Sequence, residues 1–463
     1  MPATLPAMPP TPRTMKRVLM ISFQFPPMAG TSGVQRALRF AQQLPEEGWT
    51  PSILTVHPRA YEHTGTDLLD EVPAGMTVTR AFGLDAARQL SLAGRYPGLL
   101  ARPDRWTSWL LGAVPAGLAM IRAERPDVIW STYPIPTAHR IGHALARLSG
   151  LPWVADFRDP MAHEGYPADP VLWRSFAAVE RLVFGRARRM TFTTPGAARL
   201  YAARFPETAD RLRVIENGYS EEAFQAAERQ VRNRGPAPGH GHAQPQAQAY
   251  APAQGHADAP RILLHSGVIY PDWRSPAGLF QALAAAKAAG RLSAARFQLR
   301  LRATAHDDFV QRLAAEHGVH DLVQVLPALP YVDALAEMLQ ADGLLLLQSR
   351  DCNDQIPAKA YEYLRAGRPI LTLADPAGDT AQLMHRAGLL HQAPLEDAAA
   401  IDAALHGFLD DWETGQPTRP DRTHILSASR RARTTELAQV LDEACRDTRA
   451  PRAAQPPIQR ARP

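Results

Sequence analysis

Short apolar runs alternate along the chain with longer segments in which apolar residues recur every three or four positions. The short runs predict buried strands, and the periodic segments predict helices packed against them. Repeated alternation of strand and helix is typical of an α/β fold with a parallel, doubly wound sheet. The expected strands cover residues 17–22, 51–56, 76–81, 128–131, 153–156 and 190–193 in the first half, and 261–266, 297–302, 323–326, 344–347 and 369–373 in the second.

The clearest strand–loop–helix unit occupies residues 343–369. Its apolar run (344–347) suits a parallel strand buried on both faces. A polar loop (348–356) follows, and then a helix with Pro357 in its first turn and Gly367 at its end. Such loops present ligand sites at the carboxyl ends of parallel strands, and a helix N-terminus there attracts phosphate.

Two side chains of this predicted helix are candidates for binding a ligand. Lys359 and Glu362 are three residues apart and therefore share one face of the helix. A lysine binds phosphate and a carboxylate accepts hydrogen bonds from sugar hydroxyls, so the pair would form a nucleotide clamp. A solvated ion pair on an ordinary helix explains the spacing equally well, and the spacing alone leaves both interpretations open.

Two strand ends in the first half carry further candidates. The loop after the first strand contains Gly30 and Gly33, and glycines let a backbone approach a ligand closely. The charged residues Asp156, Arg158 and Asp159 lie where the strand at 153–156 ends. Folds of this kind carry their ligand-binding and catalytic residues at such strand ends. A plain connecting loop and a strand-end ion pair are the structural alternatives.

The length and composition predict two domains. At 463 residues the chain is long enough for two domains of roughly 200 residues each. Two cysteines favour neither a disulfide framework nor a cysteine zinc site. The expected division is a disordered tail at 1–15, a first domain at 16–227, a flexible insert rich in Pro, Gly, His, Ala and Gln at 228–260, a second domain at 261–424, a terminal helix at 425–445 and a disordered basic tail at 446–463.

The net charge of +5 is concentrated at the carboxyl end. Five arginines against Asp447 place +4 in the last 18 residues, so the folded body is close to neutral and a nucleic-acid groove is not expected. The amino-terminal segment lacks the apolar core of a signal peptide, and no apolar run reaches the roughly 18–20 residues of a membrane span. These features predict a cytoplasmic protein.

Residues 174–189 interleave five arginines with phenylalanine, valine and leucine. A basic amphipathic helix of this kind can lie on anionic lipid, which would bring the protein to the inner face of the cytoplasmic membrane. A core-facing helix with a solvated edge shows the same pattern.

Several segments together resemble the GT-B retaining glycosyltransferases of family four. The resemblance implies two Rossmann-like domains facing a cleft, with a nucleotide-sugar donor in the second domain and an acceptor in the first. It covers nearly the whole chain except the two tails and the 228–260 insert. The segments that carry it are Phe-Pro-Pro-x-Ala-Gly at 25–30, Arg-Ala-Leu-Arg-Phe-Ala at 36–41, Leu-Pro-Glu-Glu-Gly-Trp at 44–49, Pro-Trp-Val-Ala-Asp-Phe-Arg-Asp at 152–159, Ile-Glu-Asn-Gly at 215–218 and Tyr-Glu-Tyr-Leu-Arg-Ala-Gly-Arg-Pro at 361–369.

The family's donor-binding signature implies roles for four residues of the second domain. It ends in the glutamate that holds the nucleotide ribose, and Glu362 matches that glutamate. The position eight residues earlier, a glutamate near the transferred sugar in the family, is Asp354 here. Residues 356–359 resemble the Ile-Pro-x-Lys variant of one branch of the family, which implies donor contacts from Ile356 and Lys359.

The resemblance also implies contacts with the donor diphosphate. Gly267, in a His-x-Gly element, corresponds to a glycine that approaches the diphosphate closely, and Arg274 corresponds to a basic residue that pairs with phosphate. Gly30 and Gly33 would lie against the donor phosphate or the acceptor.

Residues of the first domain are implied in acceptor binding. His139, Asp156, Arg158 and Asp159 match positions that line the acceptor cleft of the family. We expect His139 and Asp156 to orient the acceptor and not to act as bases, because in retaining relatives the leaving phosphate is thought to take the acceptor's proton.

The implied activity is that of a metal-independent transferase of the EC 2.4 type. No Asp-x-Asp pair occurs in the sequence, which removes the usual metal–diphosphate ligand of the other main glycosyltransferase fold. The leaving-group charge would then be neutralised by Arg274, Lys359 and a helix N-terminus, without a cofactor. The implied partners are a nucleotide sugar and a saccharide or lipid-linked acceptor of bacterial polysaccharide synthesis, and no nucleic acid.

Three alternative functions compete with this one. A sugar-nucleotide epimerase has the same architecture, and a catalytically inactive relative that binds the same ligands would fit the replacement at Asp354. A dinucleotide oxidoreductase is disfavoured, because no expected strand is followed by Gly-x-Gly-x-x-Gly.

Overall fold

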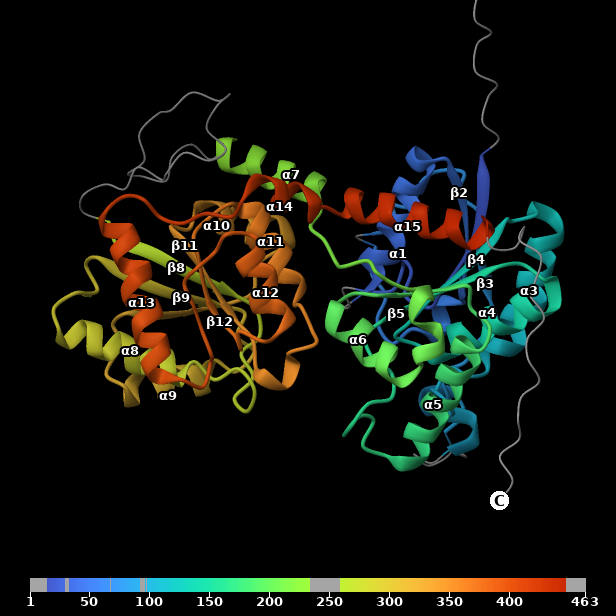
Figure 1. Cartoon of the computed structure of the whole chain (residues 1–463), viewed down its shortest axis with the longest axis horizontal. Helices are drawn as coiled ribbons and strands as arrows, with labels where there is room; N and C mark the ends of the chain where they lie inside the picture. The colour runs from blue at the N-terminus through green and yellow to red at the C-terminus, as the bar shows by residue number, and fades with distance from the viewer. Residues whose placement is uncertain are drawn as a thin grey trace, which may run out of the picture. The chain divides into compact units, whose positions relative to one another are not determined.

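The chain divides into two compact units, each built on one parallel β-sheet (Figure 1). The computed structural model describes residues 15–29, 33–66, 68–91, 96, 98–233 and 259–446. The first unit comprises the described residues of Met1–Phe192, Tyr201–Ile215 and Thr434–Pro463. The second comprises those of Thr193–Leu200 and Glu216–Arg433. The two parallel sheets define two Rossmann-like domains, as the alternating pattern predicts.

The first sheet has seven strands in the order β3-β2-β1-β4-β5-β6-β7, all paired in parallel. Its strands are β1 (Lys16–Ser22), β2 (Trp49–Val56), β3 (Val78–Ala81), β4 (Val128–Thr132), β5 (Trp153–Arg158), β6 (Arg189–Phe192) and β7 (Leu212–Val214). The helices between them are α1 (Gly33–Gln43), α2 (Ala86–Gln89), α3 (Trp109–Glu124), α4 (Pro136–Ser149), α5 (Pro170–Phe184) and α6 (Pro195–Arg204).

The second sheet has six parallel strands in the order β10-β9-β8-β11-β12-β13. Its strands are β8 (Arg261–Ser266), β9 (Phe297–Arg302), β10 (Val323–Leu326), β11 (Gly343–Leu347), β12 (Ile370–Leu373) and β13 (Gln392–Ala393). The remaining helices are α7 (Glu221–Asn233), α8 (Ala277–Ala288), α9 (Asp307–Glu316), α10 (Tyr331–Gln340), α11 (Ala358–Ala366), α12 (Asp379–Arg386), α13 (Ala398–Glu413), α14 (Arg422–Ser427) and α15 (Arg430–Arg446).

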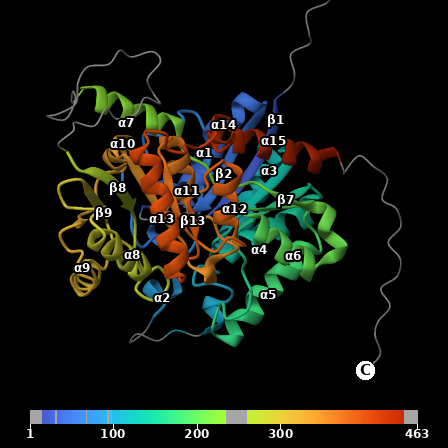
Figure 2. The same cartoon turned by 60° about the vertical axis from the view of Figure 1, so that its left-hand side comes forward.

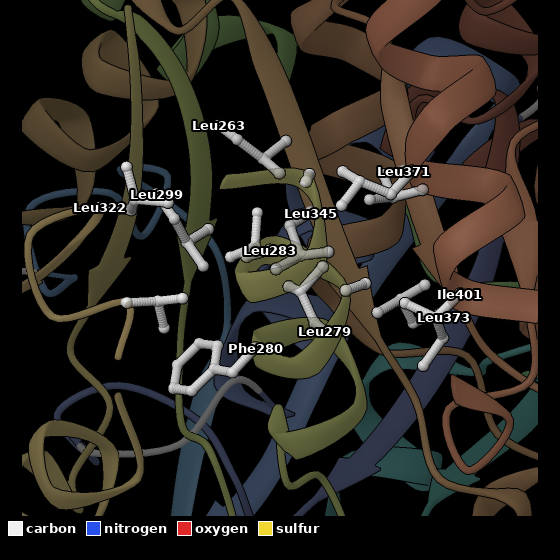
Figure 3. Close-up of a cluster of buried hydrophobic side chains, with 14 of the residues drawn as sticks. Leu263, Leu279, Phe280, Leu283, Leu299, Leu322, Leu345, Leu371, Leu373 and Ile401 are labelled. Atoms are coloured by element: carbon white, nitrogen blue, oxygen red, sulfur yellow. The ribbon is translucent and has the colours of Figure 1, made fainter. Parts of the chain in front are cut away.

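The core of the second unit lies on both faces of its sheet, and β11 shows why. Leu345 and Leu347 pack with α8, α9 and α13 on one face (Figure 3). Leu344 and Leu346 pack with α7, α10, α11 and α12 on the other. These helix layers can be followed in the turned view of Figure 2. The uniformly apolar run is therefore a strand covered on both sides, since successive side chains of a strand point to opposite faces.

The domain boundaries differ from the expected ones in three places. Residues 216–227 belong to the second unit and not to the first, because α7 packs on α10 in the core of the second unit. Residues 228–233 continue α7 instead of starting a flexible insert, and the rest of the expected insert up to 258 lies outside the described residues. The expected terminal helix is two helices, α14 and α15. The expected tails lie outside the described residues except for Met15 and Arg446.

None of the helices in the described part of the chain combines the length and the apolar character that a membrane span requires.

Candidate functional site

The loops after β8, β9, β10 and β11 lie along one edge of the second sheet, because these strands are parallel. Hydrogen bonds join the first two loops: the amide of Gly267 donates to the carbonyl of Arg302 (2.8 Å), and that of Ile269 donates to Thr304 (3.0 Å). This is the edge at which open α/β sheets bind ligands. The α11 helix begins there, directly after the β11 loop.

Lys359 lies at this edge, on the first turn of α11. Its Nζ atom is 3.4 Å from Nε2 of His265, a fully buried residue at the end of β8. Nδ1 of His265 is 2.9 Å from the carbonyl oxygen of Leu345. Burial, and then the charge of Lys359, hold the pKa of His265 well below its usual value, so the ring is neutral. Nδ1–H therefore donates to Leu345, and Nε2 faces the ammonium group as an acceptor.

The ammonium group also lies against the backbone of Gly267. This glycine has a φ of 138°, which side-chain-bearing residues rarely adopt. A Cβ atom at this position would stand 2.3 Å from Nζ of Lys359. The conformation of this position therefore requires glycine, and the structure brings together two residues that were predicted separately.

Burial, followed by the nearby charge of Arg274, lowers the pKa of Lys359 to about 7, although Glu362 opposes the shift. Arg274 lies on the turn after β8, where its amide donates to the carbonyl of Tyr270 (2.8 Å) and its guanidinium is 5.7 Å from the Tyr270 ring. The positive charges of Lys359 and Arg274 repel each other, and a bound anion would offset this repulsion.

Glu362 follows Lys359 by one turn of α11 and is half-buried. Its Oε1 accepts a 2.8 Å hydrogen bond from the hydroxyl of Tyr331, the first residue of α10. Burial raises the pKa of Glu362, and the Tyr331 bond opposes that rise. Sequence reasoning missed Tyr331, because no spacing along the chain connects it to a residue 31 positions away.

The other predicted donor residues lie in different surroundings. Asp354 is on the β11–α11 loop, and 53% of its side chain is exposed. Ile356 is buried in the core of the second unit, so its side chain supports the helix instead of facing a ligand as expected. Gly30 lies outside the described residues.

His139 and Asp156 are both fully buried in the first unit, which does not fit the expected contact with an acceptor. Nδ1 of His139 is 2.8 Å from Oγ of Ser131. Burial lowers the pKa of His139 to about 4, although Asp156 opposes the shift. The ring is therefore a neutral core group.

Asp156 is saturated with partners. Its two oxygens accept hydrogen bonds from Arg36 Nε (3.0 Å) and Nη2 (2.9 Å), and from the hydroxyls of Thr132 (2.8 Å) and Thr191 (2.7 Å). Burial by itself raises the pKa of Asp156, but Arg36 and the two threonines more than reverse this and lower it overall. The structure thus shows the strand-end ion pair that was the alternative interpretation of Asp156.

Arg158 and Gly33 meet at the carboxyl edge of the first sheet. Arg158 has a φ of 62° at the end of β5, and its Nη1 donates to Oε1 of Gln24 (3.1 Å). A Cβ atom on Gly33 would stand 1.6 Å from the same Gln24 oxygen and 2.5 Å from Nη1 of Arg158. Gly33 therefore leaves room for an arginine at the start of α1. The next residue, Asp159, is exposed.

A hollow of about 640 Å³ opens farther along the edge of the second sheet. It lies at the ends of β9 and β10 and over the first turns of α9. Ala303, the residue that directly follows β9, lines this hollow.

Comparisons with known proteins agree with this architecture. Residues 32–218 match the family model described as "Glycosyl transferase 4-like domain". No curated protein sequence matches the chain.

Solved structures match almost the whole chain at low identity. The α,α-trehalose 6-phosphate synthase of Burkholderia multivorans is 16% identical, with a TM-score of 0.59 over 96% of this chain and 100% of that one. HepE of Anabaena in complex with UDP is 12% identical, with a TM-score of 0.54 over 94% and 99%. A glycosyltransferase of Rickettsia africae is 13% identical, with a TM-score of 0.54 over 94% and 97%.

The two parallel sheets and these structural matches define a protein with the GT-B fold. The match of residues 32–218 to the glycosyl transferase 4-like model agrees with the sequence resemblance.

Proposed function

We propose that this protein is a glycosyltransferase that moves a sugar from a nucleoside-diphosphate sugar to a saccharide or lipid-linked acceptor. The observation that carries the proposal is the position of Lys359, whose ammonium group lies against Gly267 and beside the neutral His265. This arrangement leaves an ammonium group at the ligand-binding edge of the sheet, with Arg274 and Glu362 close enough to affect its pKa.

The donor would bind along the edge of the second sheet. Lys359 and Arg274 would contact the diphosphate, together with the free amides at the start of α11. The backbone of Gly267 would allow the phosphates to come close. Glu362, held by the Tyr331 hydroxyl, would accept hydrogen bonds from the ribose hydroxyls. HepE, which shares the fold, was solved with UDP, which supports a nucleotide ligand.

The chemistry would consist of stabilising a departing diphosphate. The bond from the anomeric carbon to the phosphate oxygen breaks with its electron pair on that oxygen, and Lys359 and Arg274 offset the charge that develops there. The acceptor hydroxyl attacks from the same side, and its proton passes to the departing phosphate, so the anomeric configuration is retained. We propose that no metal ion or cofactor takes part.

The acceptor would contact the first domain, and the exposed carboxylate of Asp354 would lie near the transferred sugar. Because His139 and Asp156 are buried, we assign the acceptor contact of the first domain to Arg158 and Asp159. We further propose a role in polysaccharide synthesis in the cytoplasm, with α5 touching the inner face of the cytoplasmic membrane.

Titration calorimetry with nucleoside diphosphates tests the donor site. Lys359→Ala and Glu362→Ala should each weaken binding by about tenfold or more, because each removes a charged partner of the ligand. Lys287→Ala is the matched control: this lysine of the same domain pairs with Asp321 at the surface and should leave affinity unchanged. Unchanged affinity in both site variants would remove these assignments.

Product analysis tests the reaction. Nucleotide sugars are incubated with and without a saccharide acceptor, and the products are analysed by NMR. The sugar should be transferred with retention of its anomeric configuration, and the transfer should continue in the presence of EDTA. Epimerised donor in the absence of acceptor would identify an epimerase instead. Tight donor binding with no turnover would identify a binding protein.

A further inference from the structure

The hollow at the ends of β9 and β10 lies next to the proposed ribose position. The loop after β9 is joined to the loop after β8 by the bond from Ile269 to Thr304. On its other side, Pro327 lines the hollow, and the same loop leads directly to Tyr331, which contacts Glu362. The lining residues are Ala303, Ala305, His306, Asp307, Asp308, Phe309, Arg312, Pro327 and Ala328. A nucleotide with its ribose at Glu362 therefore has room for its base here.

Two side chains of the hollow offer opposite hydrogen-bonding chemistry. Asp308 and Arg312 are four residues apart on α9, and therefore neighbours on one face of the helix. Both are exposed, and within the described residues neither side chain takes part in a hydrogen bond or an ion pair. Asp307 differs, because one of its oxygens accepts a hydrogen bond from Thr304. Asp308 thus offers a hydrogen-bond acceptor to a ligand in the hollow, and Arg312 offers a hydrogen-bond donor.

Among the common nucleobases, guanine alone offers a carboxylate two adjacent N–H donors with an acceptor beside them. Guanine presents an acceptor, O6, beside two donors, N1–H and the N2 amino group. A carboxylate can accept from both donors while a guanidinium donates to O6. The pairing edge of uracil has one N–H donor between two carbonyl oxygens, so a carboxylate there would meet at least one oxygen of like partial charge.

Resting on the proposed function, we infer that the hollow selects guanine and that the donor is a GDP-sugar. Asp308 recognises N1–H and the N2 amino group, and Arg312 recognises O6. The rings of His306 and Phe309 border the same hollow and give the base an apolar edge to lie against.

Calorimetry with a panel of free nucleotides tests the base identity. The wild-type protein should bind GDP about tenfold or more tightly than UDP. It should also bind GDP more tightly than inosine diphosphate (IDP), whose base lacks the N2 amino group. Asp308→Ala should abolish the difference between GDP and IDP. Glu316→Gln, at the far end of α9, is the control and should keep that difference.

A gain of binding separates recognition from misfolding. Asp308→Asn should lose affinity for GDP and gain affinity for XDP, because xanthine carries an oxygen where guanine carries the amino group and the asparagine amide can donate to it. A wild-type protein that binds UDP more tightly than GDP, or an unchanged ratio of GDP to XDP affinity in Asp308→Asn, overturns the inference and leaves the proposed function standing. Absence of binding by every nucleotide in the panel removes both.

Discussion

The Nζ atom of Lys359 lies 3.4 Å from Nε2 of His265, an imidazole kept neutral inside the second domain. The buried ring gives the ammonium group a fixed position but no compensating charge. Burial and Arg274 lower the pKa of Lys359 to about 7, so its charge depends on whether an anion is present. A bound diphosphate would raise that pKa again, which couples binding to proton uptake.

Binding of a nucleoside diphosphate should therefore weaken as the pH rises above about 7. The protonated lysine is the binding form, and above its pKa each further pH unit should lower the affinity by up to about tenfold until the pKa of the bound state is reached. Calorimetry between pH 6 and pH 9 in buffers of different ionisation enthalpy measures both the affinity and the proton uptake. Lys287→Ala should show the wild-type profile.

The ligand-free protein should show the opposite trend in stability. The pKa of Lys359 is about 7 in the folded chain and near 10.5 in the unfolded chain, so the unfolded chain binds more protons between these values. The contribution of this residue to stability therefore increases from about pH 7 to about pH 10.5, and Lys359→Met should remove that contribution. A stability profile that is identical in wild type and Lys359→Met would show that the lysine is not desolvated as the structure indicates.

The ion pair between Arg36 and Asp156 should be essential for the first domain. Arg36→Ala leaves a buried carboxylate that keeps hydrogen bonds from two threonine hydroxyls but loses its ion-pair partner, and the expected loss is about 3–5 kcal/mol of unfolding free energy. Denaturant unfolding measures it. Arg39→Ala, which breaks the nearby pair with Glu71, should cost no more than about 1 kcal/mol.

The contribution of Asp156 to the unfolding free energy should depend on pH in the opposite direction in Arg36→Ala. In the wild type the pKa of Asp156 is lowered, so its stabilising contribution is present above the pKa of the unfolded chain and is lost as the pH falls through the folded value. In Arg36→Ala, burial should raise the folded pKa, so acidification should recover part of the lost stability. Equal losses at pH 5 and pH 8 would contradict this account.

The sequence predicted the fold well because each signal in it is local. The leucine run 344–347 and the residues Pro357 and Gly367 place β11 and α11 to within a residue or two. The spacing of Lys359 and Glu362 on one helix face is also a local property, and the structure confirms it. The contacts of Lys359 with His265 and Gly267 join positions more than 90 residues apart. Only the resemblance placed Lys359 and Gly267 at one site, and no signal in the sequence placed His265 there.

The first domain shows where such reasoning fails. His139 lies on α4, the helix that follows β4, and Asp156 lies near the end of β5, yet both side chains are buried in the core. Their partners Ser131, Arg36 and Thr191 come from three different elements, so burial could not be read from either segment alone. A polar residue at a strand end therefore identifies the edge of a sheet but not the direction of its side chain.

The α5 helix provides the last prediction, because its buried face fits a core-facing helix and its exposed face allows the membrane interpretation to be tested. Phe176, Val179 and Val183 are buried in the core, as expected of an ordinary amphipathic helix. Arg174 and Arg181 are exposed, and Trp173 and Leu182 beside them expose 37% and 40% of their surface. A stripe that combines cations with exposed apolar side chains is suited to the surface of an anionic membrane.

Vesicle sedimentation should show binding to vesicles that contain phosphatidylserine and weaker binding to vesicles of phosphatidylcholine alone. Arg174→Ala and Arg181→Ala should each weaken the first by about fivefold, since a basic residue near such a surface contributes about 1 kcal/mol. Arg122→Ala, at an exposed position on α3, is the control and should leave binding unchanged. Equal losses in all three variants would indicate attraction by net charge instead of by α5, and binding that is insensitive to salt would exclude an electrostatic contact altogether.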